Sequence, residues 1–495
     1  MSNAHHEMSK DELWDALEGA EGFERGHILY TLALRHRSDD EWSQVIIFAE
    51  QSAEVMHSID STREEGYAFE LIGQAQDAMH EHDTAIETFM KAATLFHGIS
   101  LDEGLGSVYA YAGYAARHKK DHAGAAGYFA QSEMFYSQCM DMEESVAGAA
   151  RDLGNSLARV DNREIDSLEA LKRSLNHALG NSELHFIYEV HDDLVDAYLR
   201  VHDLGKALEH AESALRLAKT CPCPHCMPVA TYRLGYVLRI CGKLDEANKT
   251  INEAYTIAKG NGNASLQAKC MVEFGKMQTE DDLDAAEESF KNALVVMEST
   301  AANGGISVCK HWLGRVASER DSFGQACAYF KEAIDNAEEA RLGSRTFAPM
   351  HQSFAKTLIK QGKNREAIVV LESIGWHKST EPINGIAVAK HMALYAQALL
   401  ANGQTADALI RAELTLEQTS ANQWHEITAE CHEVRSRVLL HKDPTAADRS
   451  AVLALAHYTL GNRPEDAARM ATEFIVEPHR MLKLVAADHE FREAQ

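Results

Sequence analysis

A short cysteine-rich segment is the place where neighbouring residues of this sequence could bind a metal ion. It reads Cys-Pro-Cys-Pro-His-Cys and contains Cys221, Cys223, His225 and Cys226. Three thiols and an imidazole are good zinc ligands. However, four ligands from six consecutive residues would strain a tetrahedral site. We therefore favour a proline-stiffened linker with incidental thiols, and a zinc site is the alternative.

Motifs of common enzyme classes are absent from the sequence. It has no Gly-x-x-x-x-Gly-Lys-Ser/Thr loop, no His-Glu-x-x-His motif, no Gly-x-Ser-x-Gly motif and no strand followed by a glycine-rich dinucleotide fingerprint. The glycine-rich stretch from Lys259 to Ala264 lies between two predicted helices, so we interpret it as a linker. We expect a protein that is not an enzyme and that needs no cofactor.

Composition and charge favour a helical protein that is not built to bind nucleic acid or anionic lipid. Hydrophobic residues make up 45% of the 495 residues, and 8 prolines and 30 glycines are few for this length, which favours long helices. Asp and Glu number 75 against 48 Lys and Arg, and the net charge is −27. Nucleic acid therefore ranks last among the possible partners. The sequence has no apolar run that could span a membrane and no signal-peptide core, so we expect a cytoplasmic protein.

A period of about 40 residues organises most of the chain. Small residues recur at this spacing at Ala33, Gly73, Gly113, Gly154, Val195, Gly235, Gly275, Gly314, Ala355 and Ala396. A second series, mostly alanine, follows at Val45, Ala85, Ala125, Ala207, Ala247, Ala286, Ala326, Ala367 and Ala408. A third series of small residues follows seven positions after the second, often with a phenylalanine between, as in Ala125, Phe129 and Ser132. Residues four and seven apart share a helix face, so these series predict paired helices that approach closely. The fourth unit lacks the expected alanine, and we expect an insertion or skewed packing there.

These repeats resemble the tetratricopeptide repeat (TPR) family, in its longer variety. Trp312-Leu-Gly314, Ala326, Phe330 and Ala333 match the family pattern best. The resemblance implies an all-α fold, namely a right-handed α-solenoid of about ten TPR-like helical hairpins over residues 26–426. A Ser9-x-x-Glu12 capping box predicts an N-terminal capping helix within residues 1–25, and residues 427–495 are expected to form a degenerate repeat and a C-terminal cap.

The resemblance also implies a concave groove lined by the first helix of each hairpin. In this family the residues one, four and five positions after the small residue point into the groove. Most of our candidate binding residues fall at these offsets, and Arg151 lies one helical turn before Asn155. The candidates are Arg117, Arg151, Asn155, Arg159, Arg200, Arg239, Lys276, Arg315, Lys356, Lys360, Tyr114 and Tyr236. The alternative is that these cations pair with nearby carboxylates, as surface lysines and arginines often do.

A row of guanidinium and ammonium groups suits carboxylates, because charge-assisted bonds are strong in a partly desolvated groove. We therefore predict a scaffold that binds a partner protein or peptide, with an acidic segment favoured. Arg151 and Asn155 resemble the pair by which some TPR proteins hold a terminal carboxylate, but Glu189 and Asp193 interrupt the row. Two alternatives stay open: a regulatory sensor of a peptide or anionic small molecule, and a self-associating structural subunit.

Overall fold

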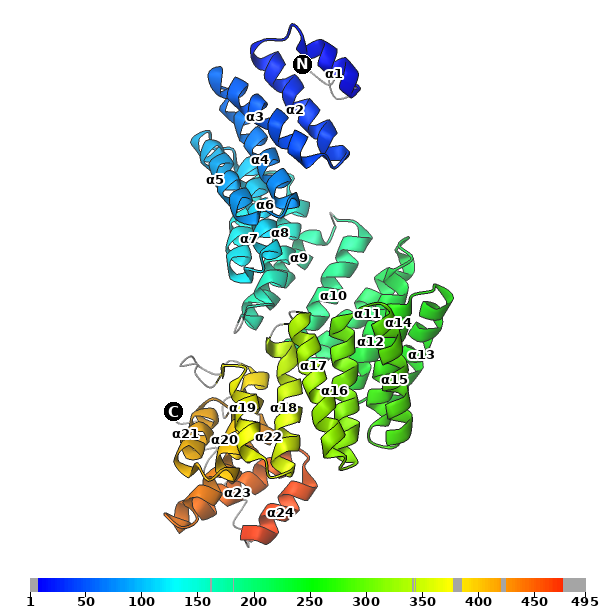
Figure 1. The fold of residues 1–495 in the computed structure, drawn as a ribbon, viewed down its shortest axis with the longest axis vertical. Helices are drawn as coiled ribbons and strands as arrows, with labels where there is room; N and C mark the ends of the chain where they lie inside the picture. Colours follow the sequence, from blue (N-terminus) through cyan, green and yellow to red (C-terminus); the bar gives the residue numbers. More distant parts are fainter. Residues whose placement is uncertain are drawn as a thin grey trace. The chain divides into compact units, whose positions relative to one another are not determined.

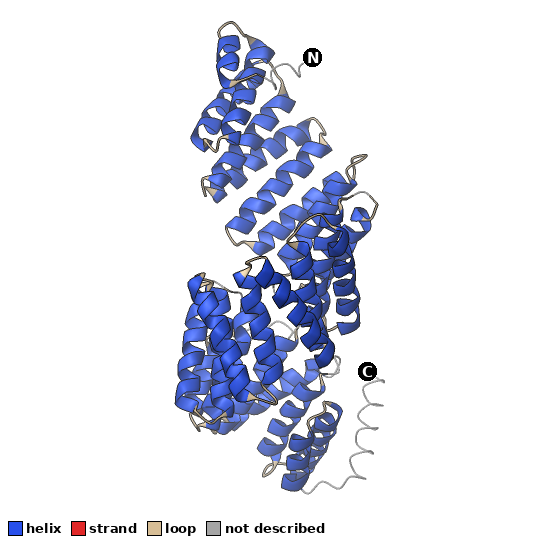
Figure 2. Cartoon of the chain, turned by 90° about the vertical axis from the view of Figure 1, so that its right-hand side faces the viewer, coloured by secondary structure: helices blue, strands red, loops and turns tan. Residues whose placement is uncertain are grey.

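The computed structural model describes residues 8–160, 163–180, 182–340, 342, 344–376, 385–419 and 424–474. Within these ranges the chain consists of helices and the short connections between them, and it contains no strand (Figure 2). The all-α fold predicted from composition and periodicity is therefore confirmed. None of the described helices is both long enough and apolar enough to cross a membrane.

Two compact units divide the chain, and the boundary between Thr250 and Ile251 falls inside α13. The first unit contains the helices drawn from blue to green in Figure 1. They are α1 (Lys10–Leu17), α2 (Gly22–Ser38), α3 (Trp42–Ser58), α4 (Thr62–Ala78), α5 (His82–Gly98), α6 (Asp102–His118), α7 (His122–Tyr136), α8 (Glu143–Leu157), α9 (Glu164–Ala178), α10 (Leu184–Arg200), α11 (Leu204–Thr220), α12 (Cys226–Ile240) and the start of α13 (Leu244–Gly260).

The second unit continues the same pattern of alternating helices after α13. Its helices are α14 (Ala264–Gln278), α15 (Leu283–Ser299), α16 (Asn303–Glu319), α17 (Phe323–Glu339), α18 (Ser344–Lys360), α19 (Asn364–Glu372), α20 (Ile386–Ala401), α21 (Thr405–Thr419), α22 (His425–Leu439), α23 (Pro444–Leu460) and α24 (Pro464–Phe474). The predicted boundary after residue 426 falls within α22, and the part of the predicted cap beyond Phe474 lies outside the described residues.

Helices that follow each other in sequence pack together within each unit, and first helices of successive hairpins also touch one another. Contacts between first helices join α4 to α6 and α10 to α12 in the first unit. In the second unit they join α16 to α18, α18 to α20 and α20 to α22. This is the stacking of a helical-hairpin solenoid of the TPR type, as the sequence predicts. The right-handed twist of the array stays a prediction.

A glycine of the first helix and an aromatic residue of the second helix form the core of several hairpins. A Cβ atom at Gly113 would lie 2.7 Å from Cε1 of Phe129, and a Cβ atom at Gly314 would lie 2.8 Å from Cε1 of Phe330. Both phenylalanines are fully buried. Because carbon atoms in contact stay about 3.5–4.0 Å apart, only glycine fits there. The predicted role of the small residues in close helix packing is confirmed.

The fourth hairpin keeps this arrangement with serine in place of alanine. Ser167 and Ser174 of α9 are buried, and their hydroxyls donate to the backbone carbonyls of Gly154 and Ala147 in α8, each at 2.7 Å. Leu171 lies against Gly154, where other hairpins have phenylalanine. Serine is small enough for the close approach of the helices, and its hydroxyl is hydrogen-bonded to a backbone carbonyl. The predicted insertion is therefore not needed to explain the missing alanine.

Candidate functional site

Most of the predicted groove cations of the first unit lie on first helices, and two of them, Arg117 and Arg151, bind the protein's own carboxylates. Arg117 of α6 donates to Oδ1 of Asp152 in α8 at 2.7 Å, and the hydroxyl of Tyr114 donates to Oδ2 of the same carboxylate at 2.7 Å. The Arg117 guanidinium also lies 5.0 Å from the centre of the Tyr114 ring. Burial and the Asp152 carboxylate raise the pKa of Tyr114. These side chains join α6 to α8.

Arg151 and Asn155 of α8 form a second internal network, with carboxylates of α10. Nε of Arg151 donates to Oδ2 of Asp193 at 2.6 Å, its NH1 donates to Oε2 of Glu189 at 2.6 Å, and Nδ2 of Asn155 donates to Oδ2 of Asp193 at 2.9 Å. Burial alone would lower the pKa of Arg151, but Asp193 and Glu189 raise it above its usual value. The pair that resembles a carboxylate clamp thus holds carboxylates of the neighbouring helix.

The remaining candidates of the first unit lie near the ends of α8, α10 and α12. Arg159 is exposed in the turn after α8, and Arg200 is the exposed last residue of α10. The Arg239 guanidinium lies 5.6 Å from the centre of the Tyr236 ring. Tyr236 stacks in turn on Tyr232, with ring centres 6.4 Å apart.

Arg315 of the second unit has a different environment from Arg117 and Arg151. Its guanidinium lies 4.2 Å from the centre of the Trp312 ring, and its side chain is exposed. Among the described side chains, none forms an ion pair with it. Lys276 approaches the same indole at 5.5 Å, but its Nζ also donates to Oε1 of Glu273 at 2.6 Å. Arg315 is thus a cation on an aromatic platform, which leaves its outer face open to an anion.

A cavity of about 640 Å³ lies on the first helices of the second unit. The residues one, four and five positions after the small residues of α18 and α20 all line it. They are Lys356, Ile359, Lys360, Gln397, Leu400 and Ala401. Residues of α22, α23 and α24 complete the lining, Glu430 and Tyr458 among them. The cavity therefore contains two of the predicted groove cations, Lys356 and Lys360.

The three arginines of this cavity are neutralised by acidic residues. Arg437 pairs with Glu473 at 2.7 Å, Arg463 with Asp466 at 2.5 Å, and Arg469 with Glu433 at 2.7 Å. Two of these ion pairs link α22 with α24, and the pair of Arg463 with Asp466 joins the preceding turn to α24. A bound anion would have to compete with carboxylates that are already in place.

Lys356, Lys360 and Glu430 are the charged groups of the cavity that lack a close internal partner within the described part of the chain. No described carboxylate lies within ion-pair distance of Lys356, and Nζ of Lys360 is 3.9 Å from Oε1 of Glu319. No described donor forms a hydrogen bond with Glu430, and burial raises the pKa of its carboxyl group to about 7. These three side chains can therefore interact with a ligand without breaking a strong internal contact.

A cavity of about 560 Å³ in the first unit is lined mainly by aromatic and histidine side chains. Its polar centre is Asp77 of α4. The two oxygens of Asp77 lie 2.6 Å from Nδ1 of His82 and 2.9 Å from Nδ1 of His118. The three groups are close enough to hold a metal ion, but in this arrangement they satisfy one another by hydrogen bonding.

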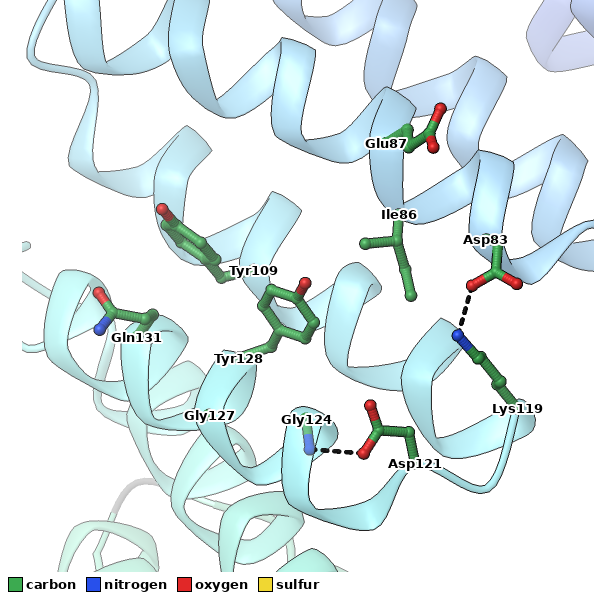
Figure 3. A pocket seen from close by; sticks show the side chains of 10 residues that line it. All are labelled: Asp83, Ile86, Glu87, Tyr109, Lys119, Asp121, Gly124, Gly127, Tyr128 and Gln131. Carbon is green, nitrogen blue, oxygen red and sulfur yellow. Dashed lines mark hydrogen bonds and ion pairs between the residues drawn. The ribbon is translucent and has the colours of Figure 1, made fainter.

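Figure 3 shows a third cavity, of about 490 Å³, between the second helices α5 and α7. Lys119 pairs with Asp83 at 2.5 Å, and the carboxylate of Asp121 accepts from the backbone N–H of Gly124 at 2.9 Å. The first contact joins the turn before α7 to α5, and the second caps α7, so both have a structural role.

The cysteine-rich segment connects α11 to α12. Cys226 is the buried first residue of α12, and His225 is its exposed N-cap residue. The histidine that approaches the thiols is His185 of α10, whose Nδ1 lies 3.2 Å from Sγ of Cys226. Sequence reasoning missed His185 because its contact with the cysteines depends on the packing of α10 against α12. Its position 41 residues before Cys226, one repeat away, is the signal that could have identified it.

No protein-family model and no curated protein matches this chain. It is similar in structure to the apo form of RapI, with 15% identity and a TM-score of 0.48 over 56% of this chain and 100% of that chain. It is similar to the apo form of the quorum sensor NprR from B. thuringiensis, with 13% identity and a TM-score of 0.48 over 66% and 91% of the two chains. The human IFIT1 dimer with PPP-AAAA has 14% identity and a TM-score of 0.45 over 85% and 90%.

Proposed function

We propose that this protein is a non-enzymatic scaffold that binds a segment of a partner protein or peptide on its first helices. The acidic part of that segment binds on α16 and α18 in the second unit. The observation that carries this proposal is the cavity of about 640 Å³, which contains lysines without close internal carboxylates. Its volume lies in the range of about 300–1,000 Å³ that is common for ligand-binding pockets.

The charge distribution on these helices supports an acidic ligand. Arg315 of α16 and Lys356 and Lys360 of α18 occupy groove offsets on two first helices that touch each other. Glu319 is the nearest carboxylate, and its ion pair with Lys360 is long, at 3.9 Å. On these two helices the three cations outnumber Glu319, while Glu430 of α22 lines the same cavity as the two lysines. Ligand carboxylates can form charge-assisted hydrogen bonds there.

Only some of the predicted groove cations are available to bind a ligand. Arg117 and Arg151 hold internal carboxylates at 2.6–2.7 Å, and a ligand would have to displace those carboxylates. Breaking such partly buried pairs is costly, because the released carboxylate would lose its partner. Arg315, Lys356 and Lys360 need no such exchange, so we assign acidic recognition to them.

The apolar part of the same face would contact those side chains of the ligand that neighbour its acidic residues. Trp312 lies under Arg315, and Ile359 and Leu400 line the cavity next to the lysines. An aromatic ring and aliphatic side chains provide contact area that polar groups alone do not. We therefore expect the preferred segment to carry hydrophobic residues next to its carboxylates.

Selection from a displayed library of random short peptides tests this function. The wild-type chain should enrich peptides with Asp and Glu. The triple variant Arg315→Glu, Lys356→Glu, Lys360→Glu should lose that enrichment while its circular dichroism stays that of the wild type. If the wild type shows no preference for acidic peptides, or if the triple variant selects the same peptides, the proposal is wrong.

A matched control separates local recognition from the change in net charge. Lys331 of α17, Lys363 before α19 and Arg365 in α19 are exposed cations outside the first helices. The variant Lys331→Glu, Lys363→Glu, Arg365→Glu changes the net charge by the same amount. Long-range repulsion of an acidic peptide is therefore the same in both variants. The control variant keeps Arg315, Lys356 and Lys360, so it should select the same acidic peptides as the wild type.

A further inference from the structure

Three thiols and one imidazole converge at the junction of α10, α11 and α12, in the first unit. Cys221 follows the last residue of α11, Cys223 lies in the connecting segment, and Cys226 is the first residue of α12. His185 is the second residue of α10. Without a metal ion, the Cys226 thiol contacts Nδ1 of His185, and the other two thiols pack against the same core cluster.

The distances within the cluster are close to those of a tetrahedral zinc site. Sγ of Cys226 lies 3.8 Å from Sγ of Cys221, and Nδ1 of His185 lies 3.2 Å from Sγ of Cys226 and 4.0 Å from Sγ of Cys221. The ligand atoms of His185, Cys223 and Cys226 all lie within 4.8 Å of one another, and Cys221 approaches this group at His185 and Cys226 without belonging to it. Tetrahedral zinc with ordinary bond lengths places two sulfurs about 3.8 Å apart and a sulfur and a nitrogen about 3.6 Å apart.

We propose that Cys221, Cys223, Cys226 and His185 bind one zinc ion. Thiolates and imidazole are the ligands that zinc prefers in structural sites. On binding, each thiol releases its proton to solvent and the imidazole binds through Nδ1, so no electron is transferred.

The fourth ligand differs from the one suggested by sequence proximity. With His225, all four ligands would come from six consecutive residues, which strains a tetrahedron. With His185, the segment supplies three ligands and α10 supplies the fourth, so the ion can be enclosed from two sides. His185 belongs to the group of converging ligand atoms, and His225 does not.

Zinc-bound histidines usually donate the N–H of their second ring nitrogen to a carboxylate, and His185 has a carboxylate on that side. Nε2 of His185, the nitrogen that faces away from Cys226, is 3.5 Å from Oε1 of Glu189. Glu189 is held in turn by NH1 of Arg151 at 2.6 Å. A carboxylate that accepts from the second ring nitrogen fixes the tautomer and orientation of a zinc-bound imidazole. The Arg151 network thus supports the metal site from α8.

Zinc binding would join α10 to the connection between α11 and α12. The connecting segment has no helix of its own between Thr220 and Cys226, and its cysteines pack with Tyr188 and Ala214. One ion held by both elements would fix their relative position. Chelation of the metal should therefore lower the thermal stability of the protein, because zinc binds the folded site better than the unfolded chain.

Metal analysis of the full-length reduced protein tests the proposal. The protein is expressed with added zinc, freed of loosely bound metal, and analysed by mass spectrometry of the elements. We expect about one zinc ion per chain. Titration of the metal-free protein with Co²⁺ should give the visible bands of a tetrahedral site and the near-ultraviolet bands of thiolate ligation.

Five variants identify the ligands and the carboxylate that supports them. His185→Ala should weaken zinc binding by more than about 100-fold, and Glu189→Gln by about 10- to 100-fold, as for residues that orient a ligand. His225→Ala is the matched control for the histidine and should bind zinc like the wild type. Cys223→Ser should weaken the thiolate bands and zinc binding, because two thiolates remain, whereas Cys241→Ser, a free cysteine at the end of α12, should leave both unchanged.

The proposal is overturned if the reduced wild-type protein contains little zinc and gives no tetrahedral cobalt spectrum. It is also overturned if His225→Ala loses zinc while His185→Ala keeps it. The wild-type measurements decide the matter even if a cysteine variant fails to fold. None of these measurements depends on peptide binding, so the zinc site and the proposed function can fail independently.

Discussion

Arg151 neutralises two carboxylates of the neighbouring first helix, and we expect its removal to destabilise the protein. Arg151→Ala leaves Asp193 and Glu189 without their guanidinium, and Asp193 is mostly shielded from solvent, with 21% of its side chain exposed. The loss should lower the free energy of unfolding by about 2–4 kcal/mol. Urea unfolding of both proteins measures this difference.

Arg159→Ala is the matched control, because Arg159 lies on the same hairpin and is exposed. It should change the free energy of unfolding by less than about 0.5 kcal/mol. Equal effects of the two substitutions would mean that the Arg151 network contributes little to stability. Arg151 would then be available to bind a ligand carboxylate.

Glu430 predicts a pH dependence of stability that originates in the cavity of the second unit. Burial raises the pKa of its carboxyl group from 4.5 to about 7, so the folded protein holds a proton that the unfolded chain releases at lower pH. This group therefore destabilises the fold as pH rises from 4.5 to about 7. Glu430→Gln removes the effect and should stabilise the protein above pH 7 by on the order of 2 kcal/mol.

Denaturation at both ends of that range tests the prediction. Near pH 4 the wild type and Glu430→Gln should be equally stable, because the protonated carboxyl and the amide are both neutral there. A stabilisation that is the same at both pH values would show that the substitution acts through packing and not through the proton.

Residue types alone could not separate the available cations from the paired ones. The groove offsets select lysines and arginines on the first helices, but the carboxylate that neutralises each one lies about one repeat further along the chain. Asp152 follows Arg117 by 35 residues, and Asp193 follows Arg151 by 42. These pairs become visible only when successive repeats are placed side by side, because first helices contact each other across the repeat.

At the scale of the helices, the contact between glycine and phenylalanine predicts how a single methyl group affects the fold. A Cβ at Gly113 would lie 2.7 Å from Phe129, whose ring is fully buried and has little space to move. Gly113→Ala should destabilise the protein by about 1–3 kcal/mol, in spite of the higher helix propensity of alanine. Thermal unfolding monitored by circular dichroism measures the change.

Gly127 of α7 provides the control in the same hairpin. It is exposed, and nothing lies within 4 Å of the position of its Cβ. Gly127→Ala should therefore stabilise the protein by up to about 1 kcal/mol. If Gly113→Ala also stabilises the protein, helix contact does not require glycine at that position.

The helical hairpins were predictable because small residues at fixed spacing are needed wherever two helices approach closely. The same reasoning failed for the fourth hairpin, since it required alanine where serine serves as well. Ser167 and Ser174 are buried and bind backbone carbonyls of α8, so their hydroxyls need no solvent. His185 was missed for another reason: it joins the cysteines only through the packing of α10 against α12.

At the scale of the whole molecule, recognition of an acidic segment must work against a net charge of −27. The overall field repels an acidic peptide, and only side chains within about one Debye length, about 8–10 Å, can attract it. Under the proposed function, specificity comes from local contacts with Arg315, Lys356 and Lys360.

A thermodynamic cycle between ligand and protein tests this claim most directly. One peptide selected by the wild type is compared with a version in which every side-chain carboxylate is replaced by the matching amide. Both are titrated by calorimetry into the wild type and into the variant Arg315→Glu, Lys356→Glu, Lys360→Glu. We predict that the amide peptide binds the wild type at least about tenfold more weakly, while the variant no longer prefers the acidic peptide. The same loss of affinity in both proteins would contradict the proposal, because the carboxylates would then bind elsewhere on the chain.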